Sequence, residues 1–210
     1  MKKLILLLLM MGMIALQTGC AASSAQETNL PEKNPQVAFE LMDGQKFVIE
    51  LLPEYAPNTV NNFISVAQSG FYEGTVFHRI LPDLIIQGGG IAEAEAEPGT
   101  YYEKDVGYSI KGEFSENDFP QNTLKHERGV ISTARTMEPD SAGSQFFILM
   151  DSYPDWDGKY AAFGRVVSGM ETIEFINRYY IENGFEGEIP KIKSVTVDTF
   201  GHNYPEPAKV

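Results

Sequence analysis

The stretch FHRILPDLIIQGG at residues 77–89 and the stretch GSQFFILMDSYPDWDGKYAAFG at residues 143–164 decide how this chain folds. Both consist of short apolar runs, rich in β-branched and aromatic residues, that polar turn residues interrupt. Runs of this length and composition are typical of β-strands. We expect four strands in or next to these stretches, over residues 76–80, 84–87, 145–150 and 161–167.

The flanking sequence adds further strands. Residues 36–51 contain two strand-like runs around Asp43-Gly44, a dipeptide that favours a hairpin turn. Two more strands are expected over residues 129–134 and 193–200. Many short strands separated by turn residues predict a mainly β domain, which the pattern alone assigns either to a barrel or to a sandwich.

Two segments have helical rather than strand periodicity. Pro57 suits the first turn of a helix, and apolar residues follow it at helical spacing until Gly70. A second amphipathic pattern begins at Met170 and ends near Gly184. We therefore expect two helices, which would cover the ends of a barrel.

The N-terminal segment has the composition of an export signal. Two lysines precede an apolar run over residues 4–16, and small residues follow it. The run is shorter than the ~20 residues that a transmembrane helix needs. Cys20 comes directly after this segment and resembles the acylated cysteine of bacterial lipoproteins; an incidental cysteine is the alternative. Residues 1–19 are interpreted as a lipoprotein signal peptide, and residues 20–34 as an acylated N-terminus and flexible tether.

The composition excludes several classes of function. The chain of 210 residues carries 16 Lys and Arg against 29 Asp and Glu, a net charge of −13. Nucleic acid is not expected as a partner, because phosphate binding needs a basic surface. One cysteine cannot form a disulfide within the chain, and three scattered histidines do not suggest a metal site. We expect neither a metal nor a cofactor.

The two stretches that open this section resemble the signature of the cyclophilin family of peptidyl-prolyl isomerases. Supporting matches are KGEF at residues 111–114 and HERGVISTART from His126. The resemblance extends from about residue 35 to residue 200 and implies the fold of that family, an eight-stranded antiparallel β-barrel capped by two α-helices. Residues 35–200 are then the isomerase domain, and residues 201–210 a C-terminal tail.

The reaction that the resemblance implies is rotation about the Xaa-Pro peptide bond. Amide resonance gives this rotation a barrier of about 20 kcal/mol, and the enzyme lowers it by binding the twisted amide better than the planar forms. The prolyl nitrogen of the twisted amide accepts a hydrogen bond. Arg79 matches the catalytic arginine of the family and is a permanently charged donor. Gln87 is expected to orient Arg79 by a hydrogen bond.

The resemblance also implies a pocket for the proline ring, walled by Leu84, Ile85 and Phe147. Strand alternation places Ile85 on the same face as Gln87, and Phe147 on the same face as Gln145, and it turns Phe146 into the core. Gln145 is expected to contact substrate backbone, and Arg135, which replaces a commoner asparagine, to do so through its main chain. The expected substrate-binding residues are His78, Leu84, Ile85, Ala134, Arg135, Gln145, Phe147 and Trp156.

Some positions depart from the usual pattern of the family. Leu84 and Ile85 stand where phenylalanine and methionine are common. Asp155 and Trp156 stand where an aromatic residue or histidine and a leucine are common. The pocket keeps its apolar character but changes its rim. Cyclosporin blocks many cyclophilins at this pocket, and we expect its binding to be weakened here.

These observations predict an extracytoplasmic isomerase, lipid-anchored to the bacterial cell membrane, that assists the folding of exported, proline-containing polypeptides. One alternative is a weakly catalytic cyclophilin-like binding or scaffold lipoprotein, against which Arg79, Gln87 and Phe147 argue. A solute-binding lipoprotein is the other. The resemblance also places an acidic loop next to the subsite upstream of the proline, where Lys104 is the only positive charge expected to offset it. The loop either favours basic substrates or only keeps the domain soluble. Its acidic residues are Glu93, Glu95, Glu97, Glu103 and Asp105.

Overall fold

The structure, a computed structural model, describes residues 32–184 and 190–210. The signal peptide, Cys20 and most of the tether therefore lie outside the described residues. In the described part the strands are β1 (Gln36–Leu41), β2 (Lys46–Leu51), β3 (Arg79–Leu81), β4 (Ile85–Gly88), β5 (Ile91–Glu93), β6 (Tyr101–Glu103), β7 (Val130–Thr133), β8 (Phe146–Leu149), β9 (Ala162–Ser168) and β10 (Ile192–Asp198).

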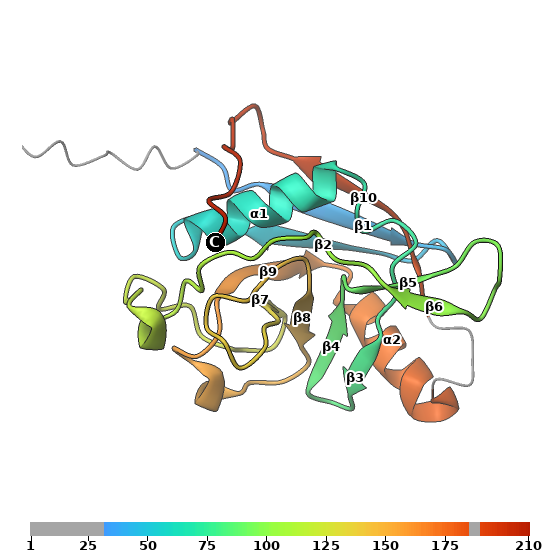
Figure 1. Ribbon diagram of the computed structural model, residues 1–210. Helices are drawn as coiled ribbons and strands as arrows, with labels where there is room; N and C mark the ends of the chain where they lie inside the picture. The colour runs from blue at the N-terminus through green and yellow to red at the C-terminus, as the bar shows by residue number, and fades with distance from the viewer. Residues whose placement is uncertain (1–31, 185–189) are drawn as a thin grey trace, which may run out of the picture.

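Eight of these strands form one curled antiparallel sheet, in the order β10-β1-β2-β9-β7-β8-β4-β3, and β5 pairs with β6 in a small second sheet. The α-helices of the described residues are α1 (Pro57–Gln68) and α2 (Met170–Asn183). They lie at different sides of the curled sheet (Figure 1). The expected mainly β fold with eight antiparallel strands and two helices is confirmed. No helix within the described ranges is long and apolar enough to cross a membrane.

Single bridges bring the two ends of the eight-stranded sheet together. Val76 pairs with Lys191, and the N–H of Ile192 donates to the carbonyl of Thr75 at 2.9 Å. The segment before β3 thus contacts the segment that begins β10. This also corrects a strand boundary: β3 begins at Arg79 rather than at residue 76, because Thr75 and Val76 bridge to other segments and not to β4.

Alternation along the strands divides the apolar side chains into two clusters. The larger cluster fills the space between the sheet and the helices, and it includes Phe146, Ile86 and Ile148. The smaller cluster lies on the opposite face of the same strands and includes Phe147 and Ile85. The expected inward direction of Phe146 is therefore correct, and the second cluster is where a binding pocket can form.

The acidic segment after β4 folds into the β5–β6 hairpin, where the sequence predicts a loop. Glu93 pairs with Lys191 and accepts a 2.8 Å hydrogen bond from the N–H of Gly99. The expectation that only Lys104 offsets these acids is wrong, since Lys191 neutralises Glu93. Lys104 itself donates to the carbonyl oxygen of Phe71 and lies over the ring of that residue.

The C-terminal tail packs on the domain. Asn58 of α1 both donates to the carbonyl of Ala208 at 3.0 Å and accepts its N–H at 2.7 Å. Lys209 bridges to Ile110, and the N–H of Val210 donates to the carbonyl of Ser109 at 2.9 Å. Figure 1 shows the end of the chain beside α1. Residues 208–210 therefore connect this helix to the loop that precedes β7.

Candidate active site

The β3–β4 hairpin carries the arginine that the sequence singles out. Arg79 lies directly opposite Gln87 in this strand pair. The Nη1 atom of Arg79 donates to Oε1 of Gln87 at 3.1 Å, and Nε2 of Gln87 donates to Oε1 of Gln145 at 2.9 Å. The expected hydrogen bond between Gln87 and Arg79 is thus present, within a chain of three side chains. Arg79 is exposed, so its remaining N–H groups can reach a ligand.

Gln145 reaches this chain because glycine makes room for it. A Cβ atom on Gly90 would lie 2.4 Å from Cδ of Gln145, and one on Gly89 would lie 2.7 Å from the carbonyl oxygen of Ser144. Gly89 also has a φ of +82°, which glycine adopts without strain. The glycine run after β4 therefore serves the close approach of β8 and its preceding loop.

The side chains expected to form the proline pocket gather in an apolar cluster on the outer face of the sheet. Phe147 lies opposite Gln87 in the pairing of β4 with β8 and is 3% exposed. The ring of Trp156 stands 5.2 Å from that of Phe147 in an edge-to-face arrangement, and the ring of Tyr160 stands 5.6 Å away. Ile85 is buried in the same cluster, and Leu84 is partly buried against it. Trp156 comes from a short 3₁₀ helix, η2 (Pro154–Trp156), which the sequence did not predict.

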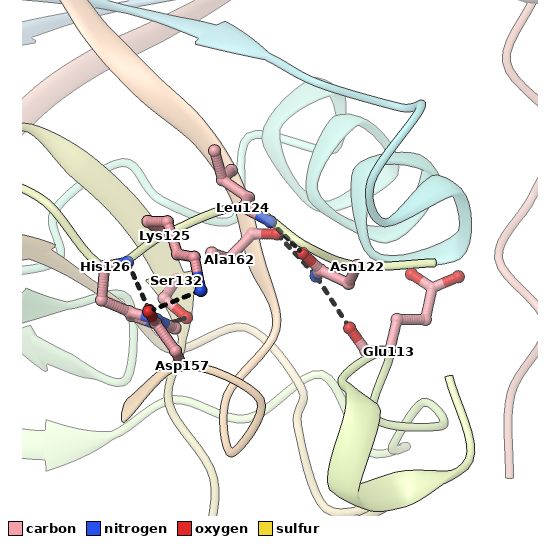
Figure 2. Close-up of polar contacts among 8 residues, drawn as sticks. All are labelled: Glu113, Asn122, Leu124, Lys125, His126, Ser132, Asp157 and Ala162. Atoms are coloured by element: carbon pink, nitrogen blue, oxygen red, sulfur yellow. Dashed lines mark hydrogen bonds and ion pairs between the residues drawn. The ribbon is translucent and has the colours of Figure 1, made fainter. Parts of the chain in front are cut away.

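A buried histidine, His126, packs against this cluster and belongs to the polar network that Figure 2 shows. The imidazole of His126 is stacked near Phe147, with ring centres 6.3 Å apart. Its Nδ1 lies 3.2 Å from Oδ1 of Asp157, and its Nε2 lies 3.1 Å from Oγ of Ser132. Lys125 pairs with the same carboxylate at 3.1 Å. The network ties β7 to the segment that carries the pocket aromatics.

The protonation states of this network follow from burial and charge. Burial lowers the pKa of His126, and the Asp157 carboxylate opposes this shift only in part. Burial tends to raise the pKa of Asp157, but hydrogen bonds from the His126 N–H and from Lys125 outweigh it, and the pKa lies below its usual value. At neutral pH a neutral imidazole therefore donates to an ionised carboxylate and accepts from Ser132.

Serine, histidine and aspartate in a row also suggest nucleophilic catalysis. Ser132 is 0% exposed and His126 is 1% exposed. Because both side chains are buried, an acyl substrate has no path to the serine oxygen. The arrangement is a structural support for the pocket, and sequence analysis missed His126 because only the folded chain brings these residues together.

A cavity of about 230 Å³ adjoins Gln87 and Gln145, and Ala134, Arg135 and Tyr108 help to line it. Ala134 donates its N–H to the carbonyl of Gln145 at 3.0 Å. The guanidinium of Arg135 has partners within the chain. It donates to the carbonyl of Lys159 at 2.7 Å and lies over the Tyr160 ring. Its side chain thus fixes the aromatic wall of the pocket.

The remaining expected residue, His78, precedes Arg79 and is partly buried. Burial lowers its pKa, so the imidazole is neutral at pH 7. Within the part of the chain that the structure describes, no group of three His, Cys, Asp or Glu side chains is placed to hold a metal ion. The site therefore offers hydrogen bonds, the exposed cation of Arg79 and the apolar cluster around Phe147.

Comparison with known sequences gives a consistent result. A family profile for cyclophilin type peptidyl-prolyl cis-trans isomerases matches residues 36–198. Peptidyl-prolyl cis-trans isomerase B of Bacillus subtilis is 41% identical over 133 residues, which cover 63% of this chain and 84% of that protein. A peptidyl-prolyl cis-trans isomerase of Acinetobacter baylyi is 35% identical over 170 residues, which cover 77% and 76% of the two chains.

Solved structures give the same relationship at the level of the fold. The crystal structure of a Cryptosporidium parvum cyclophilin type peptidyl-prolyl cis-trans isomerase aligns with a TM-score of 0.58 at 26% identity. The alignment covers 79% of this chain and 98% of that one. Because the family profile spans most of the chain and the fold agrees, the chain belongs to the cyclophilin-type peptidyl-prolyl cis-trans isomerases.

Proposed function

We propose that this isomerase rotates Xaa-Pro bonds at the surface formed by Arg79, Gln87 and the Phe147 pocket. The observation that carries the proposal is the position of Arg79, an exposed cation held by Gln87, which itself lies opposite Phe147 of the apolar cluster. Its guanidinium donates to the prolyl nitrogen when the peptide bond is twisted. Donation is weaker to either planar form, where resonance occupies the nitrogen lone pair, so the interaction favours the transition state.

One charged hydrogen bond can supply a substantial part of the reduction in the activation barrier that catalysis requires. Uncatalysed isomerisation takes ~10–100 s, and reaching milliseconds requires a rate gain of about 10⁴, or roughly 5.5 kcal/mol. A hydrogen bond from a charged donor supplies about 1.5–3 kcal/mol. The remainder comes from a preorganised, water-poor pocket that holds the proline ring in place.

The other site residues receive roles that fit their positions. The proline ring enters between Leu84, Ile85 and Phe147, with Trp156 at the edge. The Gln145 amide and the Ala134 carbonyl bind substrate backbone. Arg135 acts through Tyr160, and His78 contributes surface without any proton transfer. A Cryptosporidium parvum relative was crystallised in the presence of the dipeptide Ala-Pro, with a TM-score of 0.57 at 27% identity, which supports a proline-containing ligand for this chain.

Rotation of the prolyl bond in a short Xaa-Pro peptide, followed with and without the protein, tests this proposal. We expect the rate to rise in proportion to enzyme concentration and to fall when Arg79 is removed. Binding of the peptide without acceleration would instead identify the scaffold function considered above.

We also propose that the protein is a lipoprotein, anchored through Cys20 outside the cytoplasm, where it assists exported polypeptides. Support for this comes from the sequence alone, with its two lysines, apolar run and cysteine in that order. The intact mass of protein extracted from membranes tests it. We expect a mature chain that begins at Cys20 and carries acyl groups, and release from membranes in Cys20→Ala. An unmodified Cys20 would identify a secreted or signal-anchored enzyme.

A further inference from the structure

The turn between β3 and β4 has a backbone conformation that most residues avoid. The N–H of Leu84 donates to the carbonyl of Leu81 at 3.0 Å, which closes a turn around Pro82 and Asp83. Asp83 has a φ of +59°, in the left-handed region that residues other than glycine seldom adopt. Hydrogen bonds from a residue outside the turn would therefore stabilise this conformation.

Asn177 of helix α2 provides such hydrogen bonds. Its Nδ2 donates to Oδ1 of Asp83 at 2.9 Å, and its Oδ1 accepts the backbone N–H of Asp83 at 3.2 Å. The two hydrogen bonds run in opposite directions and fix both the backbone and the side chain of Asp83. Asn177 is 5% exposed, so these bonds replace the water that its amide loses on burial. Figure 1 shows α2 alongside the hairpin.

The β3–β4 hairpin, which these hydrogen bonds stabilise, carries four of the residues proposed for the active site. Leu84 and Ile85 follow Asp83 directly and line the pocket, while Arg79 and Gln87 face each other across β3 and β4. Because β3 is the last strand in the sheet order, its position depends on β4 and on the turn that joins them. A change in that turn moves the pocket wall and the arginine together.

We propose that Asn177 is a positioning residue of this isomerase. It lies in another element and acts through Asp83, whose conformation sets the places of Leu84 and of the Arg79–Gln87 pair. The inference rests on the roles proposed above for Arg79 and Leu84. Preorganised groups lose much of their effect when they shift by about 1 Å, so a loosened turn lowers the rate without removing any group from the site.

Exchange of the two partners tests the proposal. Asn177→Asp removes the donor and sets two carboxylates against each other, and we expect kcat/KM to fall about tenfold. Adding Asp83→Asn restores one donor that faces one acceptor, and kcat/KM should return to within about twofold of the original value. Asn183→Asp is the matched control, because Asn183 lies on the same helix and bonds only to the carbonyl of Tyr179 among the described contacts.

Two further measurements separate positioning from folding. Asp83→Ala removes the side-chain hydrogen bond of this contact and keeps the bond from the Asp83 backbone N–H, and it should also lower kcat/KM, while urea unfolding shows whether the variant is folded. Amide hydrogen exchange over residues 81–88 should accelerate in Asn177→Asp and in Asp83→Ala. It should return to the original rate in the double variant that combines Asn177→Asp with Asp83→Asn. Full activity in Asp83→Ala, or a double variant whose hairpin is protected again while kcat/KM stays low, would overturn the proposal. Full activity in Arg79→Ala would instead overturn the proposed function itself.

Discussion

Oε2 of Glu113 accepts the backbone N–H of Thr59 at 2.7 Å, and so a carboxylate from a distant loop caps the first turn of α1. Oε1 of the same group accepts the N–H of Asn58 at 3.0 Å. The helix has no side-chain cap of its own, since Ala56 occupies the N-cap position. Burial raises the pKa of Glu113, and the hydrogen bonds from Thr59 and Asn58 oppose that shift in part.

Glu113→Ala should therefore destabilise the domain by about 2–4 kcal/mol, because the buried N–H and hydroxyl of Thr59 and the part-buried N–H of Asn58 lose this acceptor. Glu113→Gln keeps one side-chain oxygen and should lose less. Urea unfolding at pH 7 measures both, with the exposed Glu116→Ala as control. Equal stabilities for Glu113→Ala and Glu116→Ala would show that the cap contributes nothing.

Arg79→Ala should lower kcat/KM at least about tenfold, since it removes a charged hydrogen bond made in the transition state. The melting temperature should barely change, because Arg79 is exposed. Arg79→Lys should also be poor, as a flexible point charge cannot reproduce the guanidinium fork. A peptide isomerisation assay decides this. Arg128→Ala, which breaks a surface ion pair with Glu174, is the control and should retain full activity.

The acidic β5–β6 hairpin should favour basic substrates because its negative charges attract them electrostatically. Glu93 is neutralised by Lys191, which leaves Glu95, Glu97, Glu103 and Asp105. Peptides with Lys or Arg two or three residues before proline should have a higher kcat/KM than those with Glu, and the gap should shrink as salt screens the charges beyond ~8–10 Å. If both peptide sets react equally at low ionic strength, the hairpin serves solubility alone.

Acid should weaken the fold through His126. Burial holds its folded pKa below the ordinary value of 6.5, so below that pH the unfolded chain binds a proton that the folded chain does not. Stability must then fall as pH drops through this range. We expect the melting temperature to decrease from pH 7.5 to 5.5, and less steeply in His126→Asn. In His126→Asn, part of the dependence of the melting temperature on pH should remain, because burial also lowers the pKa of His78. Identical slopes would contradict the assignment.

Cyclosporin should bind more weakly here than to typical members of the family, because Leu84, Ile85, Asp155 and Trp156 change the pocket rim. Trp156 is the one tryptophan of the chain and lies against Phe147, so its fluorescence reports occupation of the pocket. A titration with nanomolar affinity would show that Trp156 has replaced the usual contact.

The sequence predicted what depends on local pattern, and it failed where distant segments meet. Alternation was enough to separate Phe146 from Phe147, and proline and glycine marked the helix ends. Barrel and sandwich could not be distinguished by pattern, because closure depends on Val76 meeting Lys191. His126 stood in a motif that matched the family, but its role gave no signal for the same reason, since Asp157 and Ser132 become its neighbours only through folding.

The pairing of β1 with β10 has a consequence for how the domain forms in time. Gln36 lies opposite Asp198, so the first and last strands of the domain are neighbours. Until residues 192–198 are synthesised, β1 keeps an unpaired edge and the sheet cannot close. Such non-local pairing makes folding slow and late. The sheet of this isomerase is therefore completed last at the point where the two ends of its domain meet.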